Sequence, residues 1–377
     1  MQADIFVEQI KEIGIETLVG VPDSTLKQFC DYINYDGSGQ LRHYVPANEG
    51  AAVGIAMGTY LASGKPACVY MQNSGLGNTV NPLTSLAHED VYGIPMLLLI
   101  GWRGEPGQKD EPQHKFMGRV TEPMLECLEI SHCVIDSGTT KEEFKDMLTL
   151  AKAELDRCRQ FAIVIKKGTF SSLEGKQRSD SNGNMLVREE AIAAILRSLE
   201  KEDVVVSTTG KISRELYEQA DSIYGHHQQE FLTVGGMGHA SMIAFGIAKA
   251  RPEKRVYCID GDGALLMHMG ALAFLGTQKP DNMIHICLNN EAHESVGGMP
   301  TGAVGADYAA IAKACGYERT VTVTEVNTLE EELQRARSLK GLCFIEVKVS
   351  LDSREDLGRP KESAGENKAN FMKYHGV

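Results

Sequence analysis

The feature that most constrains the fold is the alternation of short apolar runs with helical stretches along most of the chain. Runs rich in β-branched residues predict strands at residues 17–21, 68–71, 96–100, 162–166, 204–208, 255–260, 283–289 and 343–349. Helical apolar spacing lies between them, for example at residues 49–62, 189–199, 239–250 and 329–339. Strands that are apolar on both faces and separated by helices are typical of parallel sheets. The pattern therefore predicts an α/β fold.

A polar segment divides the chain almost in half. Residues 171–184 are rich in Ser, Gly, Asn and charge and lack a hydrophobic period, which is typical of a linker. We therefore expect a first α/β domain at residues 1–170, a linker at 171–187, and a second α/β domain with a C-terminal tail at 188–377.

The two halves resemble each other in design. In each, a helix of small residues leads through a short turn into a strand that ends at a polar turn. This turn is Asn-Ser-Gly at residues 73–75 and Gly-Asp-Gly at residues 261–263. The units lie roughly 190 residues apart, so two copies of one domain explain them better than a solenoid array does. Ligands of parallel α/β sheets bind at the carboxyl ends of the strands, which makes both turns candidate binding sites.

Charge and cysteine content argue against several classes of protein. The 38 basic and 51 acidic residues give a net charge of −13, and no run of five basic residues offsets it, so we expect no nucleic-acid partner. No apolar run approaches the ~18 residues that span a bilayer, so we expect no membrane segment. The nine cysteines include no Cys-x-x-Cys pair, and the first residues do not resemble a signal peptide. These features favour a cytoplasmic chain with reduced thiols.

The most specific chemistry lies in the second half, where Asp262 and Asn290 each follow a predicted strand with 27 residues between them. A carboxylate, an amide oxygen and a nearby backbone carbonyl form the all-oxygen set that Mg²⁺ prefers, together with phosphate oxygens and water. Flanking glycines let a diphosphate approach the backbone beside a helix start. A dinucleotide fingerprint is excluded because Leu266 occupies the third glycine position. The alternative is an ordinary Gly-Asp-Gly turn and an unrelated Asn.

This spacing resembles the cofactor motif of the thiamine-diphosphate-dependent enzymes, in which Gly-Asp-Gly lies just under thirty residues before Asn-Asn. The resemblance implies thiamine diphosphate and Mg²⁺ as cofactors. It implies that the metal is bound by Asp262, Asn290 and the carbonyl of Ala292, and that Gly261 and Gly263 contact the cofactor.

An upstream loop extends the resemblance. The Gly-Gly-Met-Gly sequence at residues 235–238 matches the loop that grips the aminopyrimidine ring in this family. The match implies that the Gly235 carbonyl receives the 4′-amino group and that Met237 holds the cofactor in its bent shape. A buried core methionine is the alternative for Met237.

The family also requires a glutamate in the other domain, and Glu49 opens the first helix of small residues. The resemblance implies that its carboxyl group hydrogen-bonds ring nitrogen N1′ and activates the cofactor. Asn73, in the turn at residues 73–75, is a further expected cofactor contact. The alternative for Glu49 is a first-turn carboxylate that only complements the helix dipole.

The resemblance covers nearly the whole chain and points to a two-domain branch. Pyruvate-type decarboxylases and acetolactate synthases usually carry a middle domain, whereas only the short linker stands here. The layout therefore resembles the phosphonopyruvate decarboxylases, which are closely related to the sulfopyruvate decarboxylases. Segments 110–115, 293–298 and 356–360 support this branch. The implied fold has two similar parallel-sheet domains, one pyrimidine-type and one diphosphate-type, without a middle domain.

The implied reaction is the thiamine-diphosphate-dependent decarboxylation of 3-phosphonopyruvate to phosphonoacetaldehyde and CO₂. The alternatives are sulfopyruvate decarboxylation and a carboligase reaction on a small 2-oxo acid. A non-catalytic cofactor-binding protein would not need Glu49. Sulfopyruvate enzymes often split the two halves into separate subunits, so the fused chain favours the phosphonate.

A small anionic 2-oxo acid needs cationic or N–H donors for its tail. Four residues are expected near that tail: Arg103, Lys115, His293 and Arg359. A solvated surface charge is the alternative for each.

Two further polar residues, Asp23 and His114, match positions that assist proton transfers in related decarboxylases. Asp23 is alternatively the N-cap of a helix beginning near Thr25. The family's architecture also implies a homodimer or a larger homo-oligomer, in which each active site is built from two chains.

Overall fold

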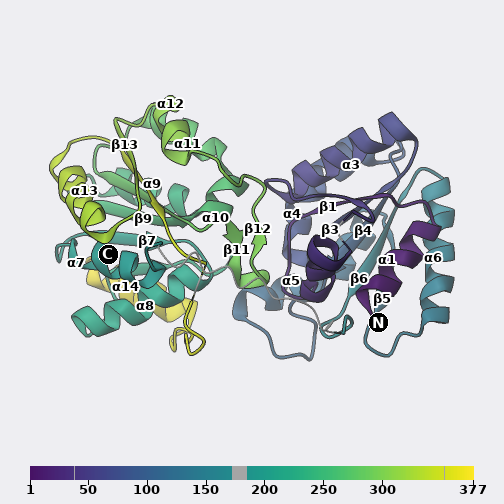
Figure 1. The fold of residues 1–377 in the computed structure, drawn as a ribbon. Helices are drawn as coiled ribbons and strands as arrows, with labels where there is room; N and C mark the ends of the chain where they lie inside the picture. Colours follow the sequence, from purple (N-terminus) through teal and green to yellow (C-terminus); the bar gives the residue numbers. More distant parts are fainter. Residues whose placement is uncertain (38, 172–184, 352) are drawn as a thin grey trace. The chain divides into compact units, whose positions relative to one another are not determined.

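The computed structural model describes residues 1–37, 39–171, 185–351 and 353–377. They form two compact units, Met1–Arg178 with His293–Gly302, and Ser179–Ala292 with Ala303–Val377 (Figure 1). The expected linker lies almost entirely outside the described residues, so the domain bounds stay a prediction. The sequence did not indicate that residues 293–302 would pack with the first unit.

The first unit contains one six-stranded parallel sheet in the order β2-β1-β3-β4-β6-β5. Helices α1, α2 and α6 cover one face, and α3, α4 and α5 cover the other. The strands are β1 Thr17–Gly20, β2 Arg42–Tyr44, β3 Ala67–Gln72, β4 Met96–Gly101, β5 Ser131–Ile135 and β6 Gln160–Ile165. The helices are α1 Ala3–Glu12, α2 Lys27–Asp31, α3 Glu49–Ser63, α4 Leu76–Pro82, α5 Pro112–Cys127 and α6 Lys141–Asp156.

The second unit contains a six-stranded parallel sheet in the order β13-β14-β10-β9-β7-β8. Helices α7, α8 and α13 cover one face, and α9 to α12 cover the other. The strands are β7 Val204–Ser207, β8 Glu230–Leu232, β9 Val256–Gly261, β10 Met283–Asn289, β13 Arg319–Val323 and β14 Cys343–Lys348. A separate short pair, β11 Ala292–His293 and β12 Met299–Pro300, lies mostly in the residues that pack with the first unit. The helices are α7 Arg188–Arg197, α8 Lys211–Tyr224, α9 Ala240–Ala250, α10 Asp262–Met267, α11 Gly270–Gln278, α12 Tyr308–Ala314, α13 Val326–Ser338 and α14 Ala364–Tyr374.

The two sheets have the same topology. When the six sheet strands of each unit are numbered from its own first strand, both sheets read 2-1-3-4-6-5. Every strand predicted from the sequence is present, and the expected α/β fold of two similar parallel-sheet domains is confirmed. Among the described residues, no helix combines the length and apolar character needed to cross a membrane.

The C-terminal helix α14 covers the edge strand β8. The side chain of Asn367 accepts a hydrogen bond from the Leu232 N–H at 3.0 Å and donates one to the Glu230 carbonyl at 3.1 Å. One side chain thus pairs backbone groups that an edge strand otherwise leaves open. The Glu230 side chain is itself buried, and burial raises its pKa from 4.5 to about 8.

This raised pKa predicts a pH-dependent stability. Between about pH 4.5 and pH 8 the unfolded chain releases the Glu230 proton while the folded chain keeps it, so stability falls as the pH rises through that window. Glu230→Gln is expected to remove this part of the fall. Urea unfolding of both proteins across the window checks it, with the exposed Glu190→Gln as the control. Equal pH profiles for Glu230→Gln and the wild type would contradict the prediction.

Candidate functional site

In the first unit, polar residues follow three neighbouring strands of the sheet. Asp23 follows β1, Asn73 follows β3 and Arg103 follows β4, and these strands lie side by side in the order β1-β3-β4. Because the strands are parallel, their carboxyl ends meet at one edge of the sheet. The structure therefore gathers residues that the sequence predicted separately.

Glu49 is the first residue of α3 and is 5% exposed. The helix begins there because the Asn48 side chain caps it by accepting the Ala51 N–H at 2.9 Å. The Glu49 carboxylate accepts a hydrogen bond from Asn78 Nδ2 at 2.7 Å. It also lies against Gly75, where a Cβ atom would come within 2.5 Å of Glu49 Oε1. These contacts hold the carboxylate in one position, unlike a first-turn glutamate that only complements the helix dipole.

Asp23 is fully buried after β1. Its carboxylate accepts hydrogen bonds from Gln72 Nε2 at 2.6 Å and from the Thr25 N–H at 2.8 Å. A Cβ atom at Gly101 would lie 2.2 Å from Asp23 Oδ2, so only glycine leaves room for this side chain. The N-cap position of α2 is Leu26, so Asp23 is not the cap of that helix. Burial raises the pKa of Asp23, which favours the protonated carboxyl that a proton-transfer role needs.

Asn73 connects the end of β3 to the end of β4 through hydrogen bonds. Its Nδ2 donates to the Arg103 carbonyl at 2.8 Å and to Thr121 Oγ1 at 2.9 Å, and its Oδ1 accepts the Arg103 N–H at 3.2 Å. Both ends of the amide are therefore used within the unit. The expected cofactor contact of Asn73 stays a prediction, and the backbone of the turn is the part left to make it.

The loop after β4 and the first turn of α5 contain three of the predicted site residues, Arg103, His114 and Lys115. Arg103 is paired with Asp110 through Nε at 2.8 Å and donates to Ser24 Oγ through Nη1 at 2.8 Å. His114 is half-buried in the first turn of α5, and burial and the Arg103 charge lower its pKa to about 4. Lys115 is exposed, and no carboxylate of the described residues pairs with it. Arg103 is thus already neutralised, whereas Lys115 is not.

In the second unit, Asp262 and Asn290 follow neighbouring strands. Asp262 is 3% exposed and begins α10 directly after β9, and Asn290 follows β10, which pairs with β9. The Asn290 side chain accepts the Ala292 N–H at 3.1 Å. Between Asn290 and Ala292, Glu291 has a φ of 58°, a left-handed conformation that folds the chain back in a tight turn. The two predicted ligands are brought to one edge of the sheet.

This edge is rich in negative charge. Burial, followed by the carboxylates of Asp262, Asp260 and Glu346, holds the pKa of the Cys287 thiol well above its usual range. The buried hydroxyl of Tyr308, whose pKa burial and Asp262 likewise raise, has no hydrogen-bond partner among the described residues. Carboxylate, amide and carbonyl oxygens in such a field fit a hard divalent cation.

The loop at residues 235–238 follows β8 and packs on the helix that Asp262 begins. Gly235, Gly236 and Gly238 have φ values of 76°, 58° and 89°, which side chains rarely adopt. A Cβ atom at Gly238 would lie 2.9 Å from the Ala264 carbonyl of α10. Met237 is half-buried within the loop. The structure thus places this loop beside the Gly-Asp-Gly turn.

A further turn at this edge was missed by the sequence interpretation. The Thr-Thr-Gly-Lys segment at residues 208–211 connects β7 to α8, and Gly210 has a φ of 100° at the N-cap of the helix. Thr209 Oγ1 accepts the Gly235 N–H at 3.1 Å, and Thr208 and Ile212 lie within contact distance of a Cβ atom built at Gly261. The signal was a glycine-containing polar turn between a β-branched strand and a helix.

The other two predicted substrate residues lie outside the loop after β4. His293 belongs to residues 293–302, which pack with the first unit, and burial lowers its pKa to about 4. Arg359 is exposed in the segment before α14. Nearby Arg354 donates to Glu189 at 2.8 Å and also pairs with Glu218, which ties this segment to α7 and α8.

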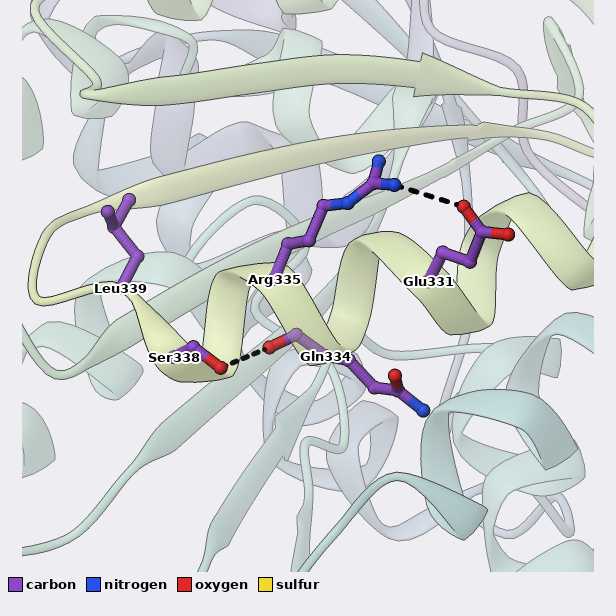
Figure 2. Close-up of a pocket in the computed structure, with 5 residues that line it drawn as sticks. All are labelled: Glu331, Gln334, Arg335, Ser338 and Leu339. Carbon is purple, nitrogen blue, oxygen red and sulfur yellow. Dashed lines mark hydrogen bonds and ion pairs between the residues drawn. The ribbon is translucent and has the colours of Figure 1, made fainter.

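A surface depression on α13 contains none of the predicted site residues. Figure 2 shows its lining, which is Glu331, Gln334, Arg335, Ser338 and Leu339. Arg335 pairs with Glu331 at 3.1 Å, and Ser338 donates to the Gln334 carbonyl at 2.9 Å. The depression is the outer surface of one helix, and we assign it no function.

Comparison with known families matches each of the two units to a known protein domain. Residues 2–152 match the thiamine pyrophosphate enzyme N-terminal TPP binding domain, and residues 209–347 match the C-terminal TPP binding domain. The matched ranges contain Glu49 and the Asp262 and Asn290 turns, respectively. The two sheets are therefore the two cofactor-binding domains of a thiamine-pyrophosphate-dependent enzyme.

Similar proteins narrow the assignment. The chain is 34% identical to a phosphonopyruvate decarboxylase of Streptomyces viridochromogenes, over 96% of this chain and 92% of the relative. It is 33% identical to a phosphonopyruvate decarboxylase of Streptomyces hygroscopicus, over 96% and 91%. It is 30% identical to a sulfopyruvate decarboxylase of Methanosarcina acetivorans, over 90% and 89%. The chain belongs to the family of two-domain thiamine pyrophosphate enzymes that contains these decarboxylases.

Proposed function

We propose that the protein is a carboxy-lyase that uses thiamine diphosphate and Mg²⁺ to convert 3-phosphonopyruvate to phosphonoacetaldehyde and CO₂. The observation that carries this proposal is the similarity to two phosphonopyruvate decarboxylases along nearly the entire chain. Within the first unit, Asp23 follows β1 and Glu49 begins α3, and within the second unit, Asp262 and Asn290 follow β9 and β10, which supports the proposal.

The oxygen-rich edge of the second unit is the proposed cofactor and metal site. Asp262, Asn290 and the Ala292 carbonyl supply hard oxygen ligands for Mg²⁺. The backbone of Gly261, Gly263 and the loop at residues 235–238 would hold the cofactor, and Met237 would support its bent shape. The bound cofactor supplies an electron sink for the carboxylate that leaves as CO₂.

In the first unit, Glu49 is proposed to hydrogen-bond ring nitrogen N1′, and Asp23 and His114 to move protons near the substrate. Asp23 suits this role because its buried carboxyl is biased toward the protonated form. His114 suits it as a neutral imidazole, since its lowered pKa leaves one ring nitrogen able to accept a proton.

The substrate tail is proposed to be bound by some of the four basic candidates. Among Arg103, Lys115, His293 and Arg359, we favour Lys115, because Asp110 neutralises Arg103 and burial keeps His293 uncharged near neutral pH. A phosphonate dianion gains most from a cation that has no carboxylate partner.

Replacing Gly75 by Ala is expected to displace the Glu49 carboxylate. The new methyl group would lie 2.5–2.7 Å from Glu49 Oε1, Cδ and Cγ. Turnover should fall on the order of 100-fold, the cost of moving a reacting group by about 1 Å. The matched control is Gly77→Ala, where a Cβ atom meets nothing within 4 Å. Equal turnover of the two variants would show that Glu49 is not positioned by Gly75.

We further propose that the active unit is a homodimer or a larger homo-oligomer with active sites between chains. Helix α3, which begins with Glu49, leaves Ile55 and Leu61 exposed and has open space around Gly54 and Gly58. An apolar helix face of this kind is suited to burial against another subunit.

A cytoplasmic location is part of the proposal, supported by nine cysteines that form no disulfide.

Two other reactions remain as alternatives. Sulfopyruvate decarboxylation is favoured by the 30% identity to a sulfopyruvate decarboxylase. A carboligase reaction differs only in joining the reaction intermediate to a second oxo acid instead of a proton.

The test is to incubate the protein, Mg²⁺ and thiamine diphosphate with phosphonopyruvate, sulfopyruvate and pyruvate in parallel. CO₂ release is measured, and the products are separated to distinguish aldehydes from ligated acids. The proposal predicts the largest kcat/KM for phosphonopyruvate and phosphonoacetaldehyde as its product. A higher kcat/KM for sulfopyruvate, or a carboligation product, would overturn the substrate assignment.

A further inference from the structure

Beneath the proposed metal turn lies a polar cluster that the proposed reaction does not use. Cys258 and Asp260 are on β9 and His285 is on the neighbouring strand β10. All three side chains are at most 1% exposed, and one sulfur, oxygen or nitrogen atom of each lies within 4.8 Å of the others. Burying such groups is costly unless they serve as partners for one another.

The contacts of this cluster lead to the turn that contains Asp262. Tyr317 OH lies 3.1 Å from His285 Nδ1, and His285 Nε2 faces Asp260 Oδ2 at 3.5 Å. Asp260 Oδ1 accepts the Gly261 N–H at 3.0 Å. Within the described residues, neither His285 Nε2 nor Asp260 Oδ2 has a hydrogen-bond partner. Their 3.5 Å contact with each other is therefore the polar contact that these two atoms make.

We propose that Tyr317, His285 and Asp260 form a buried chain of contacts that positions Asp262 for metal binding. Tyr317 fixes the imidazole of His285, the imidazole restrains the Asp260 carboxylate, and that carboxylate holds the N–H of Gly261, the residue before Asp262. The inference rests on the proposed metal site, and it names positioning residues that do not touch the metal themselves. Mg²⁺ requires near-ideal octahedral geometry, so a small rotation of the Asp262 carboxylate weakens its binding.

A metal ion within the cluster is the competing explanation, because Cys, Asp and His are all metal ligands. Two observations favour the positioning role. The other oxygen of Asp260 already accepts the Gly261 N–H of the turn, and the other ring nitrogen of His285 already contacts Tyr317 OH. Metal analysis is therefore included in the test.

The test measures Mn²⁺ binding in the presence of thiamine diphosphate by electron paramagnetic resonance, which reports both affinity and the geometry of the ligand set. Tyr317→Phe removes one oxygen and keeps the ring, and Asp260→Asn keeps the shape of the side chain. We expect at least about 5-fold weaker Mn²⁺ binding and an altered line shape for both variants. Tyr257→Phe is the control, because this buried tyrosine of β9 contacts Arg337 instead of His285.

The double variant Asp260→Asn/Tyr317→Phe should bind Mn²⁺ as Asp260→Asn alone does, since both changes break one chain of contacts. If the two substitutions weakened Mn²⁺ binding independently, their effects on affinity would add in the double variant. Such additive effects would overturn the inference. Circular dichroism shows whether each variant is folded. If Asp260→Asn does not fold, the isosteric Tyr317→Phe decides.

Asp262→Ala separates this inference from the metal site itself. If Asp262→Ala binds Mn²⁺ as the wild type does, the proposed metal site is wrong and the positioning role falls with it. If Asp262→Ala loses Mn²⁺ while Tyr317→Phe and Asp260→Asn keep wild-type affinity and line shape, only the positioning role is overturned. A second, chelator-resistant metal that disappears in Cys258→Ala would overturn it in favour of a buried metal site.

Discussion

Glu49→Gln is expected to lower turnover by at least about 100-fold while changing thiamine diphosphate affinity only a few-fold. The glutamine keeps the shape of the side chain and can still accept the hydrogen bond from Asn78. It loses the carboxyl proton that the proposed contact with N1′ requires. The measurements are kcat, calorimetric affinity, and the exchange rate of the C2 proton of the bound cofactor by NMR, which should fall in parallel with kcat.

The matched control for Glu49 is Glu142→Gln. Glu142 also lies in the first turn of a helix, α6, but it is exposed. A glutamate that only complements a helix dipole contributes at most about 1 kcal/mol and no catalysis. Wild-type C2 exchange in Glu49→Gln, as in Glu142→Gln, would show that Glu49 has only this structural role.

Asp262→Ala is expected to abolish cofactor retention in equilibrium dialysis with Mg²⁺. The carboxylate is the only charged side chain in the proposed ligand set, and its removal leaves two neutral oxygens to hold a divalent cation. Stripping the metal from the wild type with a chelator should release the cofactor to the same extent.

Asp281→Ala is the control for this change, because Asp281 is an exposed aspartate of the same unit. Cofactor retention by Asp262→Ala at the level of Asp281→Ala would mean that the metal site has been misplaced. Retention by the chelated wild type would mean that the metal does not hold the cofactor.

How far the fold can be predicted from the sequence depends on where a strand lies in its sheet. The eight predicted strands occupy the interiors of the two sheets, where both faces are buried and the sequence is continuously apolar. The four missed sheet strands, β2, β5, β8 and β13, are the edges of the two sheets. Edge strands are short or partly exposed, as the polar Arg42–Tyr44 illustrates, so their periodicity is weak.

The candidate site was predictable where one residue type carries the chemistry at a fixed spacing. Asp262 and Asn290 were predicted in this way and Glu49 from the family resemblance, and the structure places each at the carboxyl end of a strand or at the start of a helix. Pairing between side chains is not visible in a sequence. The Asp110 contact that neutralises Arg103 and the bonds that occupy Asn73 depend on loop geometry.

Tertiary packing explains what else was missed. Residues 293–302 leave the second unit and place Met299 in a core of the first, and their Gly and Pro residues predict a loop without indicating which unit it packs against. The Asp260–His285 pair was missed because an acidic residue and a histidine within apolar strands give no local signal of their contact.

We propose that Glu49 and Asp262 serve one cofactor site formed between two chains. Mixing inactive Glu49→Gln chains with inactive Asp262→Ala chains tests this arrangement. A hybrid dimer would contain one intact site and one doubly damaged site, so an equal mixture should recover about a quarter of wild-type activity after subunit exchange. Verified hybrid dimers that stay inactive would contradict a cofactor site built from Glu49 of one chain and Asp262 of another.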